Sequence, residues 1–188
     1  MKLDKKRLFI ALPLTSGVYP KIKKLEKEID KKIKTNWIPL NNLHLTLIFL
    51  GLIDLNYLHK IIKIFEQTII ENNDFFKLSY LKISKIDYGP PGKKRMIWLY
   101  INKNDKLIKM KKILETNLIK NEIKFQKENR EFLPHINLAR IKENENLPLI
   151  EKELKWEIAF NKICLYESYL DKPFARYEIL SSVRLLSS

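Results

Sequence analysis

Two short stretches of the sequence follow the same pattern: PHINLAR, residues 134–140, and NLHLTLIFLG, residues 42–51. Each places a histidine, His135 or His44, at the start of an apolar run, with a short polar residue two positions later. Successive side chains of a strand point to opposite faces. Each stretch therefore predicts a strand with one buried apolar face and one face that carries an imidazole beside a hydrogen-bonding group.

The polar partners are Thr46 in the first stretch and Asn137 in the second. If the two strands lie opposite each other, they form a cleft with two imidazoles and two short hydrogen-bond donors. One imidazole can take a proton from water while the other gives a proton to a leaving oxygen. Thr46 and Asn137 can donate to an anionic oxygen between them. This set of groups suits hydrolysis of a phosphodiester, with water as the nucleophile.

The histidines have other interpretations. A single histidine in a strand is more often structural than catalytic, but the recurrence of the pattern in two strands favours catalysis. A zinc site needs three or four ligands, and no third ligand accompanies either strand, so no metal is expected. The third histidine, His59, lies in a sequence with helical periodicity, and we expect it on a helix surface.

Composition bounds the class of protein. The 188 residues suit one domain, or two small lobes that share a core. The net charge of +14 favours polyanions, because neutralised phosphates release counterions, although AT-rich coding sequence would also enrich lysine. The lone Cys164 allows no internal disulfide and is expected to be buried. The sequence shows no signal peptide and no apolar stretch of spanning length, so a cytoplasmic protein without membrane contact, and a monomer, are expected.

The remaining pattern predicts an α+β fold, with sheets at the centre and helices outside. Asp54 is a candidate N-cap for the second helix. Strands are expected at 7–14, 43–50, 76–88, 95–102, 134–140, 156–167 and 175–184, and helices at 18–34, 54–71, 104–121 and, as a short one, 146–153.

Both histidine stretches resemble the two motifs of the 2H phosphoesterase superfamily. Within it, the chain resembles the RNA 2′,3′-cyclic phosphodiesterases, also called 2′-5′ RNA ligases. The resemblance runs nearly from end to end, from RLFIALPL at 7–14 to the late segment YESYL at 166–170. It implies a single domain over 1–188, built of two pseudo-symmetric, antiparallel-rich lobes around a central cleft.

The resemblance also implies an activity: hydrolysis of a terminal 2′,3′-cyclic phosphate on RNA, tRNA fragments included, to a 2′-phosphomonoester without metal or cofactor. By this resemblance His44 is the proton donor to the leaving oxygen, His135 is the proton acceptor, and Thr46 and Arg140 hold the phosphate. Spacing alone places Arg140, five positions after His135, on the opposite face of an ideal strand.

One position departs from the family pattern. Asn137 stands where the family usually has Thr or Ser, so the anion site is expected to be shifted or retuned. Further candidates for substrate binding are Arg130, Phe9, Trp37 and Tyr177, because cationic and aromatic side chains bind single-stranded RNA.

Three alternatives stay open at this point. The chain could be an RNA-binding module with weak or no catalysis. It could also act on a small cyclic nucleotide, an ADP-ribose cyclic phosphate or a 2′-5′ oligonucleotide, and the reverse joining of 2′-5′ ends is a further possibility.

Overall fold

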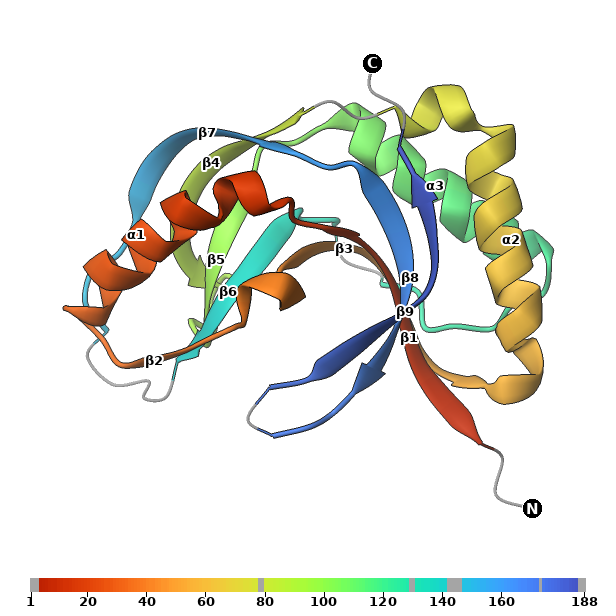
Figure 1. The fold of residues 1–188 in the computed structure, drawn as a ribbon, viewed down its shortest axis with the longest axis horizontal. Coiled ribbons are helices and arrows are strands. Elements are labelled where there is room, and N and C mark those ends of the chain that lie inside the picture. Colours follow the sequence, from red (N-terminus) through yellow and green to blue (C-terminus); the bar gives the residue numbers. More distant parts are fainter. Residues whose placement is uncertain (1–3, 78–79, 129–130, 142–146, 173, 186–188) are drawn as a thin grey trace.

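A computed structural model describes residues 4–77, 80–128, 131–141, 147–172 and 174–185. In these residues the strands form one strongly curved, mainly antiparallel sheet, and three α-helices lie outside it (Figure 1). The α+β class expected from the sequence is confirmed.

The sheet order is β7-β4-β5-β6-β3-β1-β8-β9, and β2 pairs with β6 outside this path. The strands are β1 (Lys5–Pro13), β2 (Thr35–Trp37), β3 (His44–Asp54), β4 (Tyr80–Gly89), β5 (Met96–Ile101), β6 (His135–Ile141), β7 (Lys152–Ala159), β8 (Lys162–Tyr169) and β9 (Arg176–Arg184). The α-helices are α1 (Tyr19–Asp30), α2 (Leu58–Glu71) and α3 (Asp105–Lys120), and short 3-10 helices are η1 (Ser16–Val18), η2 (Leu40–Asn42), η3 (Leu55–Tyr57) and η4 (Asn73–Phe76).

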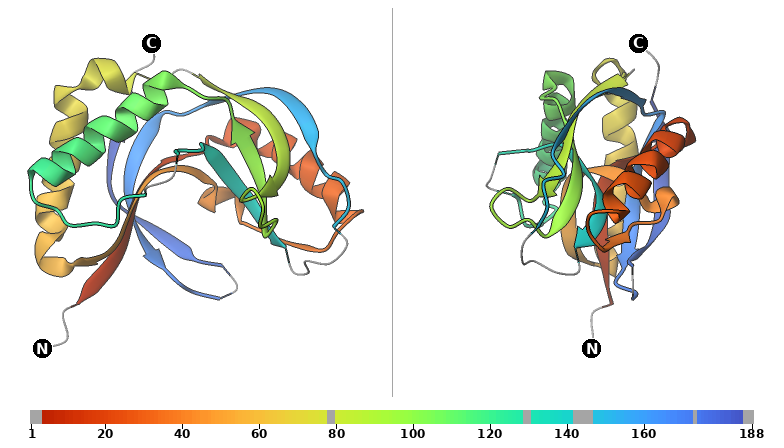
Figure 2. Two further views of the ribbon diagram at one scale, coloured as in Figure 1. Left: turned by 180° about the vertical axis from the view of Figure 1, so that it is seen from behind. Right: turned by 90° about the vertical axis from the view of Figure 1, so that its left-hand side faces the viewer.

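The helices form where apolar residues recur every three or four positions. On α1 these residues are Ile22, Leu25 and Ile29, all buried, with lysines on the opposite face. Asn104 caps α3 by accepting a hydrogen bond from the backbone N–H of Leu107 at 2.9 Å. Helices α2 and α3 pack side by side at one end of the sheet, whereas α1 lies at the other end (Figures 1 and 2).

The sheet consists of two halves that meet at the two histidine strands. One half runs β6-β5-β4-β7, and the other runs β3-β1-β8-β9. Strands β3 and β6 pair antiparallel at Leu45 and Ile136, which are both fully buried. Each half therefore places its histidine strand at the junction.

Both histidine strands contain a bulge three residues after the histidine. On β3 the partner register skips Leu47, because Ile10 faces Ile48 while Ala11 faces Thr46. On β6 it skips Leu138, because Ile97 faces Ala139 while Trp98 faces Asn137. An inserted residue reverses the alternation of all side chains beyond it. The residue five positions after each histidine consequently returns to the histidine's own face.

Three sequence expectations need correction. The helix expected over 146–153 does not form: residues 147–151 are irregular, and β7 begins at Lys152, where lysine and glutamate alternate with buried Leu154 and Ile158. The strand expected over 156–167 is two strands separated by Phe160 and Asn161. Strand β2 was missed because three residues are too few to show a period.

Other expectations hold. Asp54 caps a helix start, although it caps η3, whose chain continues into α2: its carboxylate accepts from the Asn56 N–H at 2.9 Å. Cys164 is buried, and burial raises the pKa of its thiol. His59 is exposed on α2.

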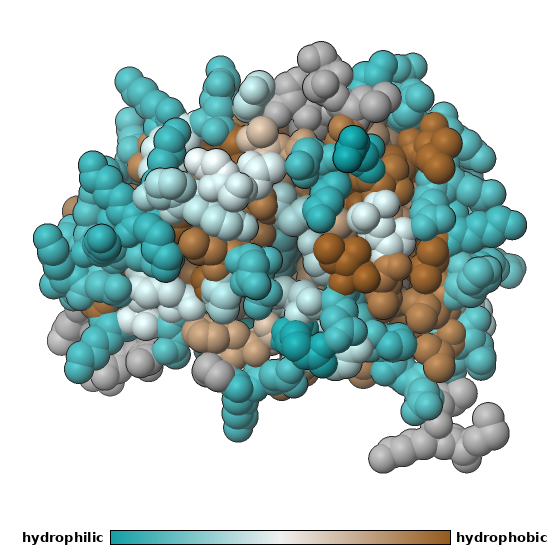
Figure 3. Space-filling model, viewed as in Figure 1, coloured by the Kyte–Doolittle hydropathy of each residue, from teal (hydrophilic) through white to brown (hydrophobic). Residues whose placement is uncertain are grey.

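No helix in the described part of the chain is long and apolar enough to cross a membrane. The face in Figure 3 is mostly hydrophilic, and apolar side chains show between strands β8–β9 and helix α2.

Candidate active site

The strand register brings the four motif residues onto one face at the centre of the sheet. Leu45 pairs with Ile136, so the antiparallel ladder sets His44 opposite Asn137 and Thr46 opposite His135. This face, called the histidine face below, thus carries a diagonal pair of imidazoles and a diagonal pair of short polar groups.

Both imidazoles are held in the same way. Nδ1 of His44 lies 2.7 Å from the backbone oxygen of Asn42, and Nδ1 of His135 lies 2.7 Å from the backbone oxygen of Leu133. A carbonyl can only accept, so each Nδ1 carries a proton. In each ring this leaves Nε2 as the atom that can take up or release a proton. The contact to the carbonyl two residues earlier repeats in both halves of the site.

His44 lies among aromatic rings. Its ring centroid is 5.0 Å from that of Phe9 and 5.2 Å from that of Tyr177, which meets it edge-on. Phe9 in turn stacks on Tyr166, with centroids 4.9 Å apart. Burial in these surroundings lowers the pKa of His44 from an ordinary value of 6.5 to about 4, the bond to Asn42 opposes this shift, and the charge of His135 lowers the pKa further. His44 is therefore neutral at pH 7 in the free protein.

His135 lies against a single aromatic residue. Its ring stacks on the indole of Trp98 on β5, with centroids 3.5 Å apart and an angle of 15° between the planes. Trp98 is 6% exposed. The other indole face meets the backbone of β4, because a Cβ placed on Gly89 would lie 2.1 Å from Cδ2 of Trp98. The indole is thus held between a glycine and the imidazole.

Arg140 lies on the histidine face, which the simple alternation of the sequence does not predict. The bulge at Leu138 turns Ala139 into the core, where it is fully buried, and leaves Arg140 exposed. The charge of Arg140 lowers the pKa of Tyr177, although burial is the larger influence and raises it. The guanidinium is thus electrostatically coupled to a ring that contacts His44.

The other predicted binding residues have different outcomes. Phe9 and Tyr177 lie beside His44, as described. Trp37 on β2 donates from Nε1 to Asp30 Oδ1 at 2.7 Å and packs against the main core, so its described contacts are structural. Arg130 lies outside the described residues.

Sequence reasoning missed Trp98, Tyr166 and Gly89. The signal for Trp98 was its place in the alternating strand MIWLYI, residues 96–101, where it shares a face with Tyr100. Tyr166 falls in a strand that is buried on both faces. The importance of Gly89 depends on a contact between strands and leaves no mark in the local pattern.

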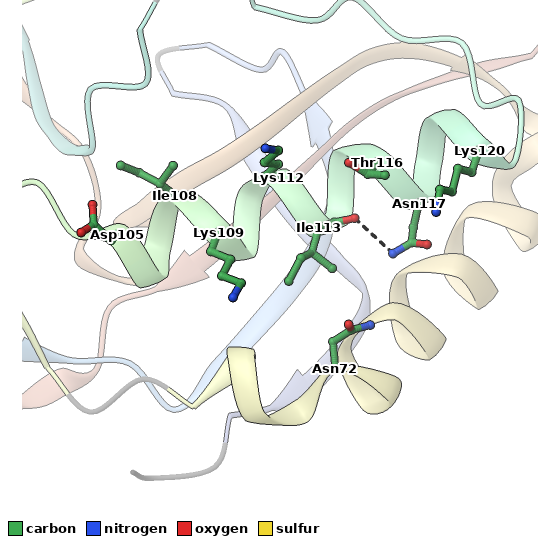
Figure 4. A pocket seen from close by; sticks show the side chains of 9 residues that line it. All are labelled: Asn72, Asp105, Ile108, Lys109, Lys112, Ile113, Thr116, Asn117 and Lys120. Atoms are coloured by element: carbon green, nitrogen blue, oxygen red, sulfur yellow. Dashed lines mark hydrogen bonds between the residues drawn. The ribbon is translucent and has the colours of Figure 1, made fainter.

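The larger of two described cavities lies away from the motif histidines. It has a volume of about 670 Å³ and lies on the outer helices (Figure 4). Nζ of Lys109, one of the lining residues, lies 3.8 Å from the ring centroid of Phe75. Its lining consists of Asn72, Asp105, Ile108, Lys109, Lys112, Ile113, Thr116, Asn117 and Lys120, and includes neither motif histidine. In the part of the chain that the structure describes, no three His, Cys, Asp or Glu side chains cluster as metal ligands would.

The pKa of His44 predicts an acid-sensitive fold. Its folded pKa, about 4, lies below the unfolded value of 6.5, so between these values the unfolded chain binds the proton and the folded one does not. Stability therefore falls as the pH falls through this window. We expect His44→Gln to abolish this contribution, at most about 2 kcal/mol at pH 5. Thermal melts of both proteins at pH 7 and pH 5 measure it: an equal loss of Tm in both would contradict the burial of His44.

Comparison with known proteins identifies a family and several relatives. Residues 8–188 match the AKAP7 2′5′ RNA ligase-like domain family. The chain is 27% identical over 187 residues to the RNA 2′,3′-cyclic phosphodiesterase of Aquifex aeolicus, covering 95% of this chain and 97% of that protein. It is 26% identical over 185 residues to the protein of the same name from Thermotoga maritima, covering 93% and 92%.

Solved structures show the same fold. TT0787 of Thermus thermophilus superposes with a TM-score of 0.74 at 20% identity, covering 96% of this chain and 98% of that one. E. coli LigT complexed with 3′-AMP superposes with a TM-score of 0.69 at 22% identity, covering 97% and 99%. The family match over residues 8–188 confirms the resemblance expected from the sequence, and the solved structures show the same fold.

Proposed function

This chain belongs to the AKAP7 2′5′ RNA ligase-like domain family, and we propose that it hydrolyses RNA 2′,3′-cyclic phosphate ends to 2′-phosphomonoesters. The observation that carries the proposal is the duplicated half-site: two imidazoles on adjoining strands, each fixed through Nδ1 to the carbonyl two residues earlier, at 2.7 Å in both cases. The names of the Aquifex and Thermotoga relatives support the choice of substrate.

The reaction follows from the two Nε2 atoms. The oxygen of a water molecule attacks phosphorus while its proton passes to Nε2 of His135. The bond from phosphorus to the 3′-oxygen breaks, and the Nε2 proton of His44 passes to that oxygen. The charged phosphoryl oxygens accept hydrogen bonds from Thr46, Asn137 and Arg140. These donors stabilise the anion between the acid and the base. The protein supplies every proton transfer in this scheme, so it requires no cofactor.

The donor role of His44 requires help from the substrate. At a pKa of about 4 the free ring is almost wholly neutral at pH 7. A bound phosphodiester anion and His44⁺ attract each other, and this attraction raises the pKa of the imidazole in the complex. Binding of the anion is therefore linked to uptake of a proton by His44.

Product analysis tests the function. An RNA oligonucleotide with a 2′,3′-cyclic phosphate end, incubated with the protein and EDTA, is expected to yield only the 2′-phosphomonoester. Activity that EDTA abolishes would contradict the metal-independent mechanism. Tight binding without product would instead support an RNA-binding module.

The same assay separates the related substrates. We expect kcat/KM to be higher for the oligonucleotide than for a 2′,3′-cyclic mononucleotide, because Phe49 and Arg140, five positions after the two histidines, are exposed and can contact a further nucleotide. A higher kcat/KM on the mononucleotide, or on a 2′-5′ oligonucleotide, would transfer the proposal to that substrate.

A further inference from the structure

Asn42 makes two contacts of different kinds beside His44. Its backbone oxygen lies 2.7 Å from Nδ1 of His44, and its side-chain Nδ2 donates to the backbone oxygen of Ala175 at 3.0 Å. The backbone of Asn42 is held without the side chain, because its N–H donates to the Pro39 oxygen at 2.8 Å. In the second half-site the corresponding residue is Leu133, whose side chain has no donor. The side-chain bond thus joins only the first half-site to the segment that contains Ala175.

That segment belongs to the end of the β8–β9 hairpin, which projects from the body of the sheet (Figure 1). Strand β8 pairs with β1 only as far as Glu167, whereas its pairing with β9 continues to Tyr169 and Arg176. The end of the hairpin, residues 168–172 and 174–177, is called the arm below. Within the described residues, the two strands of the arm pair only with each other.

The arm has contacts of its own that keep its two strands together. Cζ of Arg176 lies 3.9 Å from the ring centroid of Tyr169, and its Nε donates to Oδ2 of Asp171 at 3.3 Å. Arg176 also donates to Glu178, at the base of the arm. Loss of the bond from Asn42 would consequently release the arm as a unit and leave its own structure intact.

The arm carries one of the rings that surround His44. Tyr177 lies two residues after Ala175 and meets the imidazole edge-on, with centroids 5.2 Å apart. It also packs edge-on against Phe9, with centroids 5.1 Å apart. The bond from Asn42 to Ala175 therefore fixes the start of β9 at the point where it brings Tyr177 to the imidazole.

We propose that Asn42 is a positioning residue whose side chain holds the arm, and with it the ring of Tyr177, against His44. The carbonyl of Asn42 fixes Nδ1 of the imidazole, and the ring of Tyr177 limits the movement of the imidazole. Nε2 thereby stays directed toward the leaving oxygen. The kinetic part of this inference rests on the proposed function, whereas the contact between the arm and His44 does not.

Chemical modification tests the contact without substrate. Diethyl pyrocarbonate attacks neutral imidazoles that it can reach, and mass spectrometry of the peptides gives a rate for each histidine. In Asn42→Ala at pH 7 we expect His44 to react about 3- to 10-fold faster than in the wild type, the factor that one neutral hydrogen bond contributes. The exposed His59 is the internal reference. An unchanged rate at His44 overturns the proposal.

Two further variants show which property of the side chain matters. Asn41→Ala is the matched control, because Asn41 is the exposed neighbour of Asn42 and should leave the rate at His44 unchanged. Asn42→Leu keeps the length of the side chain and removes the N–H, so it should react like Asn42→Ala. A wild-type rate in Asn42→Leu would show that packing alone holds the arm and would overturn the role of the hydrogen bond. Circular dichroism melts identify variants that fail to fold.

The pKa of His44, measured by NMR titration, gives a second test with a definite sign. The titratable groups that face the ring are Tyr166 on β8, Tyr177 on β9 and His135 on β6, and Asn42→Ala removes none of them. Release of the arm reduces burial and should raise the pKa of His44 from about 4 toward 6.5. A fall in this pKa would mean that the side chain holds the carbonyl instead, because the backbone bond raises the pKa, and would overturn the proposal.

Kinetics on an RNA 2′,3′-cyclic phosphate end test the consequence for catalysis. Asn42→Ala should lower kcat about 3- to 10-fold with little change in KM, because His44 acts in the chemical step. Added to Tyr177→Ala, it should lower kcat no further, since both changes remove the same contact. Fully additive losses would overturn the route through Tyr177. Absence of turnover in every protein, with the modification rates as expected, would refute the proposed function alone.

Discussion

Replacing either motif histidine by alanine is expected to lower kcat/KM on a 2′,3′-cyclic phosphate RNA end by about 10²–10⁴-fold, the usual worth of a positioned general acid or base. The loss should be of similar size for His44→Ala and His135→Ala, since each removes one of two proton transfers. Steady-state kinetics on a defined oligonucleotide measure it. His59→Ala is the matched control, because that histidine is exposed on α2 and should leave kcat/KM unchanged.

A change of leaving group distinguishes the histidine that donates a proton from the one that accepts a proton. A cyclic substrate with sulfur in place of the bridging 3′-oxygen leaves as a thiolate, which needs no proton from the enzyme. We expect His44→Ala to come within about tenfold of wild type on this substrate, while His135→Ala keeps its full deficit. The opposite pattern would exchange the two roles, and the low pKa of His44 makes this comparison more informative than a pH profile. A plot of rate against pH has the same shape whichever of the two histidines donates the proton.

The second large effect is expected at Gly89. A Cβ at this position would lie 2.1 Å from Cδ2 and 2.5 Å from Cγ and Cε2 of Trp98, a distance at which the indole has to move. Gly89→Ala should therefore cost about 1–3 kcal/mol of stability through overpacking. Because the indole stacks on the imidazole of His135, we also expect kcat to fall about tenfold or more. Chemical denaturation and kinetics on the same preparation measure the two losses.

The matched control is Gly17→Ala, where a new Cβ meets no atom within 4 Å. It should change neither stability nor kcat appreciably. A Gly89→Ala protein with wild-type kcat would show that the indole can move without disturbing His135, and that the stack is incidental to catalysis.

The alternation of the two histidine strands could be predicted from sequence because burial itself imposes it. Leu45 and Ile136 must face the core, and once they do, His44 and His135 have to lie on the opposite face of the sheet. The long helices were predictable for the same reason, since their apolar stripes repeat over several turns. The predicted helix over 146–153 was wrong. A few apolar positions near a helix-like spacing stabilise a short helix less than the pairing of the next segment with β4 stabilises the sheet.

The bulges could not be predicted from the sequence pattern. An ideal strand places Arg140 away from His135, and the skip at Leu138 reverses this. The bulge becomes visible only when two strands are set side by side, because it is a mismatch between partners. The stack of Trp98 on His135 and the contact of the indole with Gly89 likewise depend on how β5 pairs with β6 and with β4.

The most direct test of the central claim, that both halves of the site act on one phosphodiester, is the product formed in H₂¹⁸O with EDTA present. An RNA 2′,3′-cyclic phosphate end should give a 2′-phosphomonoester carrying one ¹⁸O atom with the wild-type protein. His44→Ala and His135→Ala should give almost none. A 3′-phosphate product, a product without ¹⁸O, or undiminished turnover by either variant would contradict the two-histidine account.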